Sequence, residues 1–539
     1  MLGRAVARLR READGARRWA AFALALRAAM RRPLSVADAR AIVRRRLAER
    51  EANFLRMVER NIYGHPGSPY LPLLKRAGCE LGDLISMVRG DGVEETLRAL
   101  RRAGVYVAFE EFKGRQPLVR NELVMHVSPD DFINPHVTNY YSVMTGGTTG
   151  SAARVPIDLA RLTAQTPYDV LGYAAHDLMG VPSAMWRTVY GGYGINVALR
   201  GAMFRWPLHR WFSPTNAADL GTSRWDRMNT FVTVLLRLSG VSIPRPETVR
   251  LEDAAVIARW AAQTVRRQPQ CLIRGSVSMC TRIALAAQHE GLDLSGVTFF
   301  GGGEPPTPTK VRHIRASGAR WFPHYNFAEA GYVGMGCANP VDEDDLHFTR
   351  DTLALIQSPR QVPGTDITVE AFNFTSLLPT ASKVLLNVES DDYGIVEERV
   401  CGCALEREGL TTHLREVRSF RKLTGEGMTL IGSDMVRILE EVLPARFGGT
   451  PLDYQLWEEE DAAGLTRLTL VISPRVEVRD EHAVIEAILT HLRNFPPIMW
   501  RQAKTLQIRR EEPVWTARGK LMTLHIDRRP RKADSRLIV

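Results

Sequence analysis

The sequence has few cysteines, no long apolar run and no excess of acidic residues. Its 539 residues include 6 Cys, too few for the disulfide framework of a small secreted domain, so we expect thiols or metal ligands and a cytoplasmic location. The longest apolar run near the N-terminus, residues 19–30, contains Arg27 and is shorter than the roughly 20 residues of a membrane span. We therefore expect neither a transmembrane segment nor a secretory signal.

The charge of the chain is basic, with a formal net charge of +11. Arginines are spread along the sequence and no aromatic residues alternate with them in a stripe, so we expect no nucleic-acid partner. Binding through the Arg-rich first hundred residues is the alternative, and a steep salt dependence would reveal it. A basic balance also suits a site for a polyanionic small molecule.

The length predicts two or three domains. Residues 1–110 are rich in Arg and Ala and place apolar residues three and four positions apart, which predicts helices. From about residue 140, short apolar runs alternate with helical patterns, as in an α/β domain. After residue 424 a compact set of strands and helices, including a strand at 465–472 and a helix at 481–492, predicts a small α+β domain.

A Gly/Thr-rich segment follows a strand-like run at residues 140–144. Glycines let a backbone curl around a phosphate, and amide N–H groups and threonine hydroxyls donate hydrogen bonds to its oxygens. The candidate phosphate-binding residues are Thr145, Gly146, Gly147, Thr148, Thr149 and Gly150. The segment lacks the Gly-Lys-Ser/Thr ending of a Walker A loop, which disfavours a P-loop NTPase. A turn of this composition without a ligand is the alternative.

Two later segments suit a nucleotide. Glycines follow the apolar run 297–300, at the strand end where ligands bind in open α/β sheets, and a flat base can lie against that backbone. The candidates there are Gly302, Gly303 and Glu304. Further on, Tyr325 and Asn326 precede Glu329. An aromatic ring can stack on a base, and a carboxylate can hold Mg²⁺ beside phosphates.

Three more polar residues complete the pattern. Asp392, in the acidic turn at residues 389–394, can accept hydrogen bonds from a ribose, and Arg421 follows at a distance that allows a return to the same site. Lys520 comes after Gly519 in a loop before the last predicted strand. A cation there can neutralise charge that develops on a carboxylate and an α-phosphate.

In this order, the segments resemble the adenylate-forming superfamily of acyl-CoA synthetases, and most closely its phenylacetate-CoA ligase branch. The resemblance covers residues 140–530. It implies an α/β fold with a large adenylate-forming N-terminal domain that carries a helical N-terminal segment, plus a small mobile α+β C-terminal domain with the catalytic lysine. The expected parts are residues 1–110, 111–423 and 424–539, with a hinge near residues 424–427.

The resemblance assigns roles to the motif residues. Residues 145–150 would hold the β- and γ-phosphates of ATP, and the Gly302 and Tyr325 segments would frame adenine. Asp392 and Arg421 would hold the ribose, with Arg418 as a substitute. Glu329 would place Mg²⁺, and Lys520 would serve adenylation and leave the site when the C-terminal domain rotates.

The sequence departs from the family pattern at these motifs. After Gly150 the chain has Ser151 and Ala152 where the family has Lys-Pro, so one cation is missing unless Arg154 replaces it. Ala328 stands where the family has a hydroxyl residue before the glutamate. An unusual or inactive member is therefore one of the alternatives.

The acyl pocket and a metal site also follow from the resemblance. The family's Tyr/Gly-rich pocket segment matches Tyr190, Gly192 and Tyr193, and Phe204, Trp206 and Trp211 would form an apolar wall or pack in the core. Cys and His residues that the branch also carries could hold a structural Zn²⁺. They are Cys337, His347, Cys401 and Cys403. Buried thiols and a surface histidine are the equal alternative.

We therefore expect an ATP-dependent carboxylic acid–CoA ligase that uses ATP, Mg²⁺ and coenzyme A on a small carboxylic acid. One alternative is an adenylating enzyme that transfers the acyl group to a carrier-protein thiol or an amine. Another is a non-catalytic binding protein on a degenerate ligase fold. The resemblance adds a homodimer as a candidate assembly.

Overall fold

A computed structural model describes most of the chain, with gaps. The described residues are 22, 24–138, 141–144, 154–188, 193–206, 208–216, 234, 243–361, 368–419, 422–425, 428–431, 437–461, 465–491, 502, 505–514 and 524–526. None of the helices in these ranges is long and apolar enough to cross a membrane.

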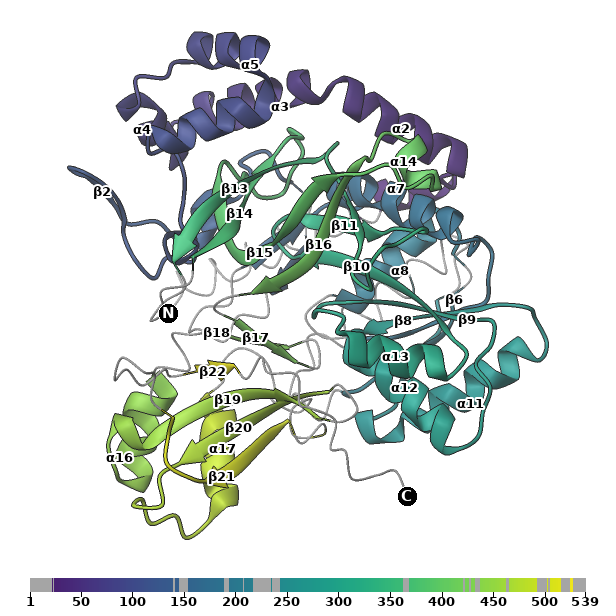
Figure 1. Cartoon of the computed structure of the whole chain (residues 1–539). Helices are drawn as coiled ribbons and strands as arrows, with labels where there is room; N and C mark the ends of the chain where they lie inside the picture. The colour runs from purple at the N-terminus through teal and green to yellow at the C-terminus, as the bar shows by residue number, and fades with distance from the viewer. Residues whose placement is uncertain are drawn as a thin grey trace, which may run out of the picture.

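The N-terminal segment is helical, as predicted. Its elements are α2 (Val36–Ala48), α3 (Arg50–Val58), the π-helix η1 (Glu59–Tyr63), α4 (Tyr70–Arg76) and α5 (Leu81–Arg102). Ser35 begins α2 because its hydroxyl accepts a hydrogen bond from the backbone N–H of Asp38, whose carboxylate binds back to Ser35. These helices lie together above the large sheet (Figure 1).

The main structure is a twelve-stranded sheet of order β13-β14-β15-β16-β12-β11-β10-β9-β8-β5-β6-β7. Its strands are β5 (Ser183–Trp186), β6 (Leu208–Ser213), β7 (Pro246–Thr248), β8 (Cys271–Ser276), β9 (Val297–Gly302), β10 (Arg320–Phe327), β11 (Gly331–Gly336), β12 (Leu346–Phe348), β13 (Leu353–Gln361), β14 (Thr368–Ser376), β15 (Val388–Glu398) and β16 (Thr412–Ser419). Neighbouring strands are parallel from β10 to β7 and antiparallel from β10 to β13.

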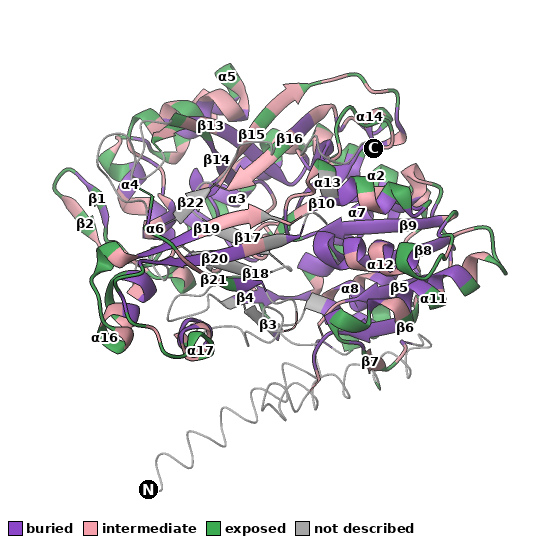
Figure 2. Ribbon diagram, turned by 60° about the horizontal axis from the view of Figure 1, so that its bottom comes forward, coloured by how far each residue is buried: buried purple, intermediate pink, exposed green. Residues whose placement is uncertain are grey.

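Helices cover both faces of the parallel part, as is usual for parallel sheets. They are α7 (Leu159–Ala175), α8 (Tyr193–Met203), α11 (Ala254–Val265), α12 (Val277–His289) and α13 (Pro308–Ala316). Ile273 and Phe299 belong to the core with α11 and α12, while Leu272 and Phe300 belong to the core with α7 and α8. Successive strand residues thus point to opposite faces, and β8 and β9 are buried along their length (Figure 2).

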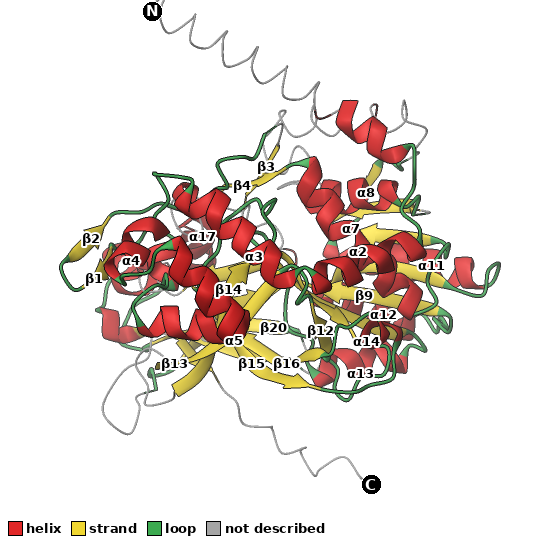
Figure 3. Ribbon diagram, turned by 90° about the horizontal axis from the view of Figure 1, so that it is seen from above, coloured by secondary structure: helices red, strands yellow, loops and turns green. Residues whose placement is uncertain are grey.

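The antiparallel part of the sheet packs against the N-terminal helices. Phe54 and Leu97 of these helices share one core with Leu355 and Phe372 of the sheet. Seen from above, α3 and α5 lie over β14 and β15 (Figure 3). The N-terminal helices therefore belong to the large body of the molecule.

A second, smaller sheet forms the C-terminal part, as the sequence predicts. Its order is β21-β20-β19-β22, from β19 (Tyr454–Glu460), β20 (Thr466–Ile472), β21 (Leu506–Arg510) and β22 (Leu524–Ile526). The helices beside it are the π-helix η5 (Ile438–Val442), α16 (Leu443–Phe447) and α17 (Glu481–His491). This α+β unit lies below the large sheet in Figure 1. The strand β19 has no counterpart among the elements predicted from sequence.

The remaining described elements are short. They are the helices α6 (Phe109–Phe112) and α14 (Ala404–Arg407), the 3₁₀-helices η2 (Pro129–Phe132), η4 (Leu251–Asp253) and η6 (Pro451–Asp453), and three two-stranded pairs. These pairs are β1 (Leu118–Arg120) with β2 (Leu123–Met125), β3 (Tyr141–Met144) with β4 (Arg154–Ile157), and β17 (Lys422–Gly425) with β18 (Met428–Ile431).

Candidate nucleotide site and metal centre

The predicted phosphate loop connects the paired ends of two strands. β3 and β4 are antiparallel, and Met144 lies opposite Arg154. Residues 145–153, which include all six candidates from Thr145 to Gly150, lie outside the described residues. The pairing shows that the two ends of this segment, at Met144 and Arg154, lie next to each other. Arg154 is the first residue of β4.

The two segments predicted to frame a base lie side by side. β9 and β10 are parallel neighbours, with Gly301 opposite Pro323, so Gly302 and Tyr325 both lie near the carboxyl ends of adjacent strands. A side chain at Gly302 is impossible without movement, because its Cβ would come within 2.5 Å of the His324 carbonyl oxygen. This is the edge of an open α/β sheet at which ligands bind.

Glu304 is engaged within the protein. Its buried carboxylate accepts hydrogen bonds from the backbone N–H of Ser278 (2.8 Å) and from the Ser278 hydroxyl (2.7 Å), and Lys310 Nζ lies 3.3 Å away. The carboxylate thus ties β9 to α12 and α13. The preceding Gly303 is exposed and has a positive φ of 85°, which favours glycine.

Tyr325 and Asp392 are brought together from β10 and β15. The Tyr325 hydroxyl donates a hydrogen bond of 2.6 Å to Asp392 Oδ2. Burial and the adjacent Asp392 carboxylate raise the pKa of Tyr325 well above its usual value, so the phenol stays protonated and remains the donor. Asn326, at a bulge in the pairing with β11, is exposed. The segments predicted to hold adenine and ribose are therefore in contact.

Glu329, the predicted metal ligand, forms a buried ion pair. Lys113 Nζ lies 2.6 Å from Glu329 Oε1. Burial would raise the pKa of Glu329, but Lys113 and, farther away, Lys383 outweigh it and lower the pKa to about 2. An ionised carboxylate fits Mg²⁺ as a hard oxygen ligand. Sequence reasoning missed Lys113, which lies 216 positions from Glu329 and carries no motif.

Four of the other predicted site residues lie in parts of the chain that the structure does not describe. Tyr190, Gly192, Arg421 and Lys520 lie outside the described residues, and Tyr193 is the first residue of α8. The substitute ribose ligand Arg418 lies opposite Tyr393 in the sheet and donates to Asp344 at 2.9 Å.

The aromatic residues predicted near the acyl pocket are buried. Trp206 and Phe204 pack against Tyr173 with ring centroids 6.0 and 5.8 Å away. Trp211 donates from Nε1 to the Arg187 carbonyl oxygen at 2.9 Å. A Cβ on Gly194 would come within 2.4 Å of the Trp211 ring, so only glycine fits where the Tyr/Gly-rich segment meets this wall.

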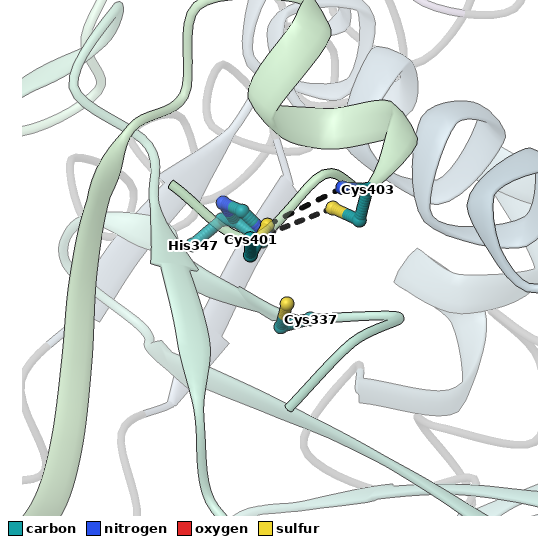
Figure 4. Close-up of side chains that lie close together, drawn as sticks. All are labelled: Cys337, His347, Cys401 and Cys403. Carbon is teal, nitrogen blue, oxygen red and sulfur yellow. Dashed lines mark hydrogen bonds between the residues drawn. The ribbon is translucent and has the colours of Figure 1, made fainter. Parts of the chain in front are cut away.

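Four predicted metal ligands converge (Figure 4). The side-chain ligand atoms of Cys337, His347, Cys401 and Cys403 all lie within 4.8 Å of one another. His347 Nε2 is 3.1 Å from Cys403 Sγ and 3.6 Å from Cys401 Sγ. The other ring nitrogen, Nδ1, lies 2.6 Å from the Leu410 carbonyl oxygen, an arrangement that orients a metal-binding histidine.

The donor set fits Zn²⁺, because three thiols and one imidazole complete a tetrahedral site with no open position. A hydrogen bond from Cys337 and the neighbouring His347 lower the pKa of the Cys403 thiol, which favours the thiolate that binds metal. Next to the cluster, His413 Nδ1 lies 2.6 Å from Asp345 Oδ1, and Arg399 contacts the same carboxylate. The other three cysteines, Cys79, Cys271 and Cys280, are buried and lie outside this cluster.

Comparison with known proteins identifies the fold. No protein-family model and no curated protein matches the chain. Among solved structures, a 2-hydroxyisobutyryl-CoA ligase in complex with 2-HIB-AMP and CoA is 14% identical, covers 89% of this chain and 90% of its own, and has a TM-score of 0.55. An amide bond synthetase from Marinactinospora thermotolerans is 13% identical over 88% of this chain and 92% of its own, with a TM-score of 0.41. The first likeness shows that the chain has the adenylate-forming enzyme fold with a C-terminal domain.

Proposed function

We propose that this protein is an AMP-forming carboxylic acid–CoA ligase of the phenylacetate-CoA ligase type. The observation that carries the proposal is the hydrogen bond from Tyr325 to Asp392 beside the Gly302 strand end. It joins the segments that the resemblance assigns to adenine and to ribose. A fold alone does not define an activity, but this contact supports a nucleotide site at the expected edge of the sheet.

The reaction has two steps. A carboxylate oxygen of the acid attacks the α-phosphorus of ATP, and the bond to pyrophosphate breaks with its electron pair. The thiol of coenzyme A then loses its proton and attacks the acyl carbon, and AMP leaves with the electron pair of the acyl–oxygen bond. Bound Mg²⁺ neutralises charge on the phosphates.

The residues have separate tasks in this proposal. Asp392 and Arg421 hold the ribose, and the backbone at Gly302 and Gly303 lies against adenine. Glu329 faces the metal and phosphates, and residues 145–150 bind the phosphates. Lys520 stabilises the charge that develops as the carboxylate attacks.

The two steps call for two positions of the C-terminal domain. We place this domain at residues 424–539 and the large domain at 111–423, after the helical segment 1–110. The proposed hinge at 424–427 coincides with the link between β17 and β18, where Gly425 pairs with Met428. Rotation there would carry Lys520 away after adenylation.

We also assign a structural Zn²⁺ to Cys337, His347, Cys401 and Cys403. Because the site is buried between β11, β12 and the loop before α14, it would stabilise the large domain. It would take no part in the reaction, since no coordination position is left for substrate.

Product analysis tests the proposal. Incubation with ATP, Mg²⁺, coenzyme A and a panel of aryl and fatty acids is expected to give equal amounts of AMP, pyrophosphate and one acyl-CoA. Formation of AMP that requires a carrier protein or an amine in place of coenzyme A would move the function to the first alternative. ATP binding with no pyrophosphate from any acid would indicate the degenerate binding protein.

A further inference from the structure

Three arginines lie close together toward the carboxyl ends of the parallel strands. Arg187 directly follows β5, Arg274 is in β8, and Arg200 comes from the covering helix α8. Arg274 Nη1 lies 2.9 Å from one carboxylate oxygen of the fully buried Asp169, and Arg200 Nε lies 2.6 Å from the other. One carboxylate therefore serves two guanidinium groups.

The third arginine, Arg187, has no counter-charge in the described part of the chain. Its Nη2 atom donates to the Gly275 carbonyl oxygen at 2.8 Å, and its buried Nε atom has no hydrogen-bond partner. The Asp169 carboxylate is held by the other two arginines, and no carboxylate of the described residues forms a salt bridge with Arg187. Burial, followed by the charge of Arg274, lowers the pKa of Arg187 to about 10, so the guanidinium group is still charged at neutral pH. Such a cation is destabilised unless an anion joins it.

Two more nitrogen atoms beside Arg187 lack hydrogen-bond partners among the described residues. They are Arg274 Nε and His324 Nδ1, in side chains that are 2% and 5% exposed. The His324 ring lies against the Gly302 strand end, because a Cβ on that glycine would come within 2.7 Å of His324 Nε2. Buried polar groups normally have partners. The group of side chains is therefore positively charged and incompletely satisfied, as in a site for an anion.

Arg187 lies on the acyl side of the proposed active site. The strand order β10-β9-β8-β5 puts β5 three strands away from β10, which carries Tyr325. With strands about 4.8 Å apart, the end of β5 is roughly 14 Å from the residue expected to frame adenine. The Arg187 carbonyl oxygen accepts a hydrogen bond from Trp211, which belongs to the predicted wall of the acyl pocket. Arg187 is half-buried, so it is the member of the group that a ligand can reach.

We infer that the acid substrate carries a second carboxylate, and that Arg187 binds it. One carboxylate of this dicarboxylic acid reacts with ATP, and the other pairs with the guanidinium group in the acyl pocket. The inference rests on the proposed function, which puts the acyl group beside Trp211. A monocarboxylic acid leaves Arg187 unpaired, and a site built for a polar group rejects an analogue that lacks it.

The test compares acids that differ only in the second carboxylate. Acid-dependent pyrophosphate release is measured for matched pairs: pentanoic and glutaric acid, hexanoic and adipic acid, benzoic and terephthalic acid. For wild type, kcat/KM is expected to be about tenfold or more higher for the dicarboxylic member of at least one pair. Arg187→Met should remove this preference by raising the KM of the dicarboxylic acid, while monocarboxylic acids change less than about twofold. Arg187→Lys, which keeps the charge, should retain most of the preference.

Arg210→Met is the matched control. Arg210 lies on the neighbouring strand β6, and its guanidinium group already pairs with Glu247. This variant should therefore match wild type with every acid. Calorimetry with AMP is the second measurement, because it tests whether Arg187 binds a phosphate instead of a carboxylate. AMP affinity is expected to change less than about twofold in Arg187→Met.

Other results overturn the inference. They are equal kcat/KM for both members of every pair in wild type, a preference that a folded Arg187→Met protein keeps, or a loss of AMP affinity as large as that for the dicarboxylic acid. If Arg187→Met unfolds, Arg187→Gln, which keeps a donor for Gly275 without the charge, gives the same comparison. A wild type that releases no pyrophosphate with any acid removes the proposed function as well, whereas release with monocarboxylic acids only removes the inference alone.

Discussion

His324 is a buried histidine among positive charges. Its ring packs on Phe300, with centroids 4.4 Å apart, and its Nδ1 atom has no hydrogen-bond partner among the described residues. Burial, followed by the charges of Arg187 and Arg274, lowers the pKa of His324 well below its usual value. The folded protein therefore keeps this side chain neutral at a pH where the unfolded chain protonates it.

This difference predicts how stability depends on pH. Because the pKa of His324 is lower in the folded than in the unfolded protein, the contribution of this group to the free energy of unfolding is fully present above the unfolded pKa of about 6.5. It is lost as pH falls below that value, by up to about 1.4 kcal/mol per pH unit. His324→Gln is expected to flatten this fall between about pH 6.5 and 5. Urea unfolding at several pH values measures it, and parallel curves for variant and wild type would show the prediction to be wrong.

Removing a ligand of the proposed zinc site is expected to lower both the zinc content and the thermal stability of the protein. Cys403→Ser removes the thiol closest to His347 Nε2, so zinc content should fall from about one equivalent to near zero, and the melting temperature should fall with it. Elemental analysis and thermal unfolding measure both quantities. Cys79→Ala is the control, since Cys79 is buried away from the cluster. Zinc-free wild-type protein after expression with ample zinc would contradict the assignment.

At the level of single residues, the sequence indicates which side chains can bind ligands or take part in catalysis. It does not indicate which residues those side chains contact. The three cysteines and His347 were predicted as a group, and they converge in the structure. Glu304 and Glu329 are predicted to face a ligand, and the sequence does not indicate the contacts with Ser278 and Lys113 that the structure shows. Buried polar groups need hydrogen-bond partners. These partners are distant in the sequence and belong to no common motif, so the sequence does not reveal them.

At the scale of elements, α5 contains a break at Gly92. This residue has a φ of 78° inside the helix, and a Cβ there would meet no atom within 4 Å. Gly92→Ala is expected to destabilise the protein by roughly 1–2 kcal/mol, because side chains disfavour this backbone conformation.

Gly90 provides a matched control two positions away. It also has open space around its Cβ position, and its φ is not positive. Gly90→Ala is expected to be stabilising by up to about 1 kcal/mol. Chemical denaturation of both variants measures the difference. Equal effects would mean that backbone conformation does not decide the outcome at Gly92.

Elements with a clear pattern were predictable, and those that depend on pairing were not. The predicted strand at 465–472 and helix at 481–492 correspond to β20 and α17. By contrast, β19 carries a run of acidic residues, Glu458, Glu459 and Glu460, that gives no strand pattern. It is held between β20 and β22, through pairing that comes from tertiary structure.

At the scale of the whole molecule, the α/β class and a separate C-terminal α+β unit were predictable from changes in pattern along the chain. The continuous twelve-stranded sheet was not, because its order places β16 beside β12 and β5 beside β8. Such pairings between distant segments leave no local signal. The packing of the N-terminal helices on β13 and β14 was hidden for the same reason.

In the proposed reaction, Lys520 from the C-terminal part of the molecule stabilises the adenylation of a carboxylic acid. The test is to measure acid-dependent release of pyrophosphate from ATP in the presence of Mg²⁺ for wild type and Lys520→Ala. We predict release that requires a particular acid and falls by about a hundredfold or more in the variant, with ATP binding retained. No release with any acid would rule out the proposed adenylation, and equal release from both proteins would rule out the role of Lys520.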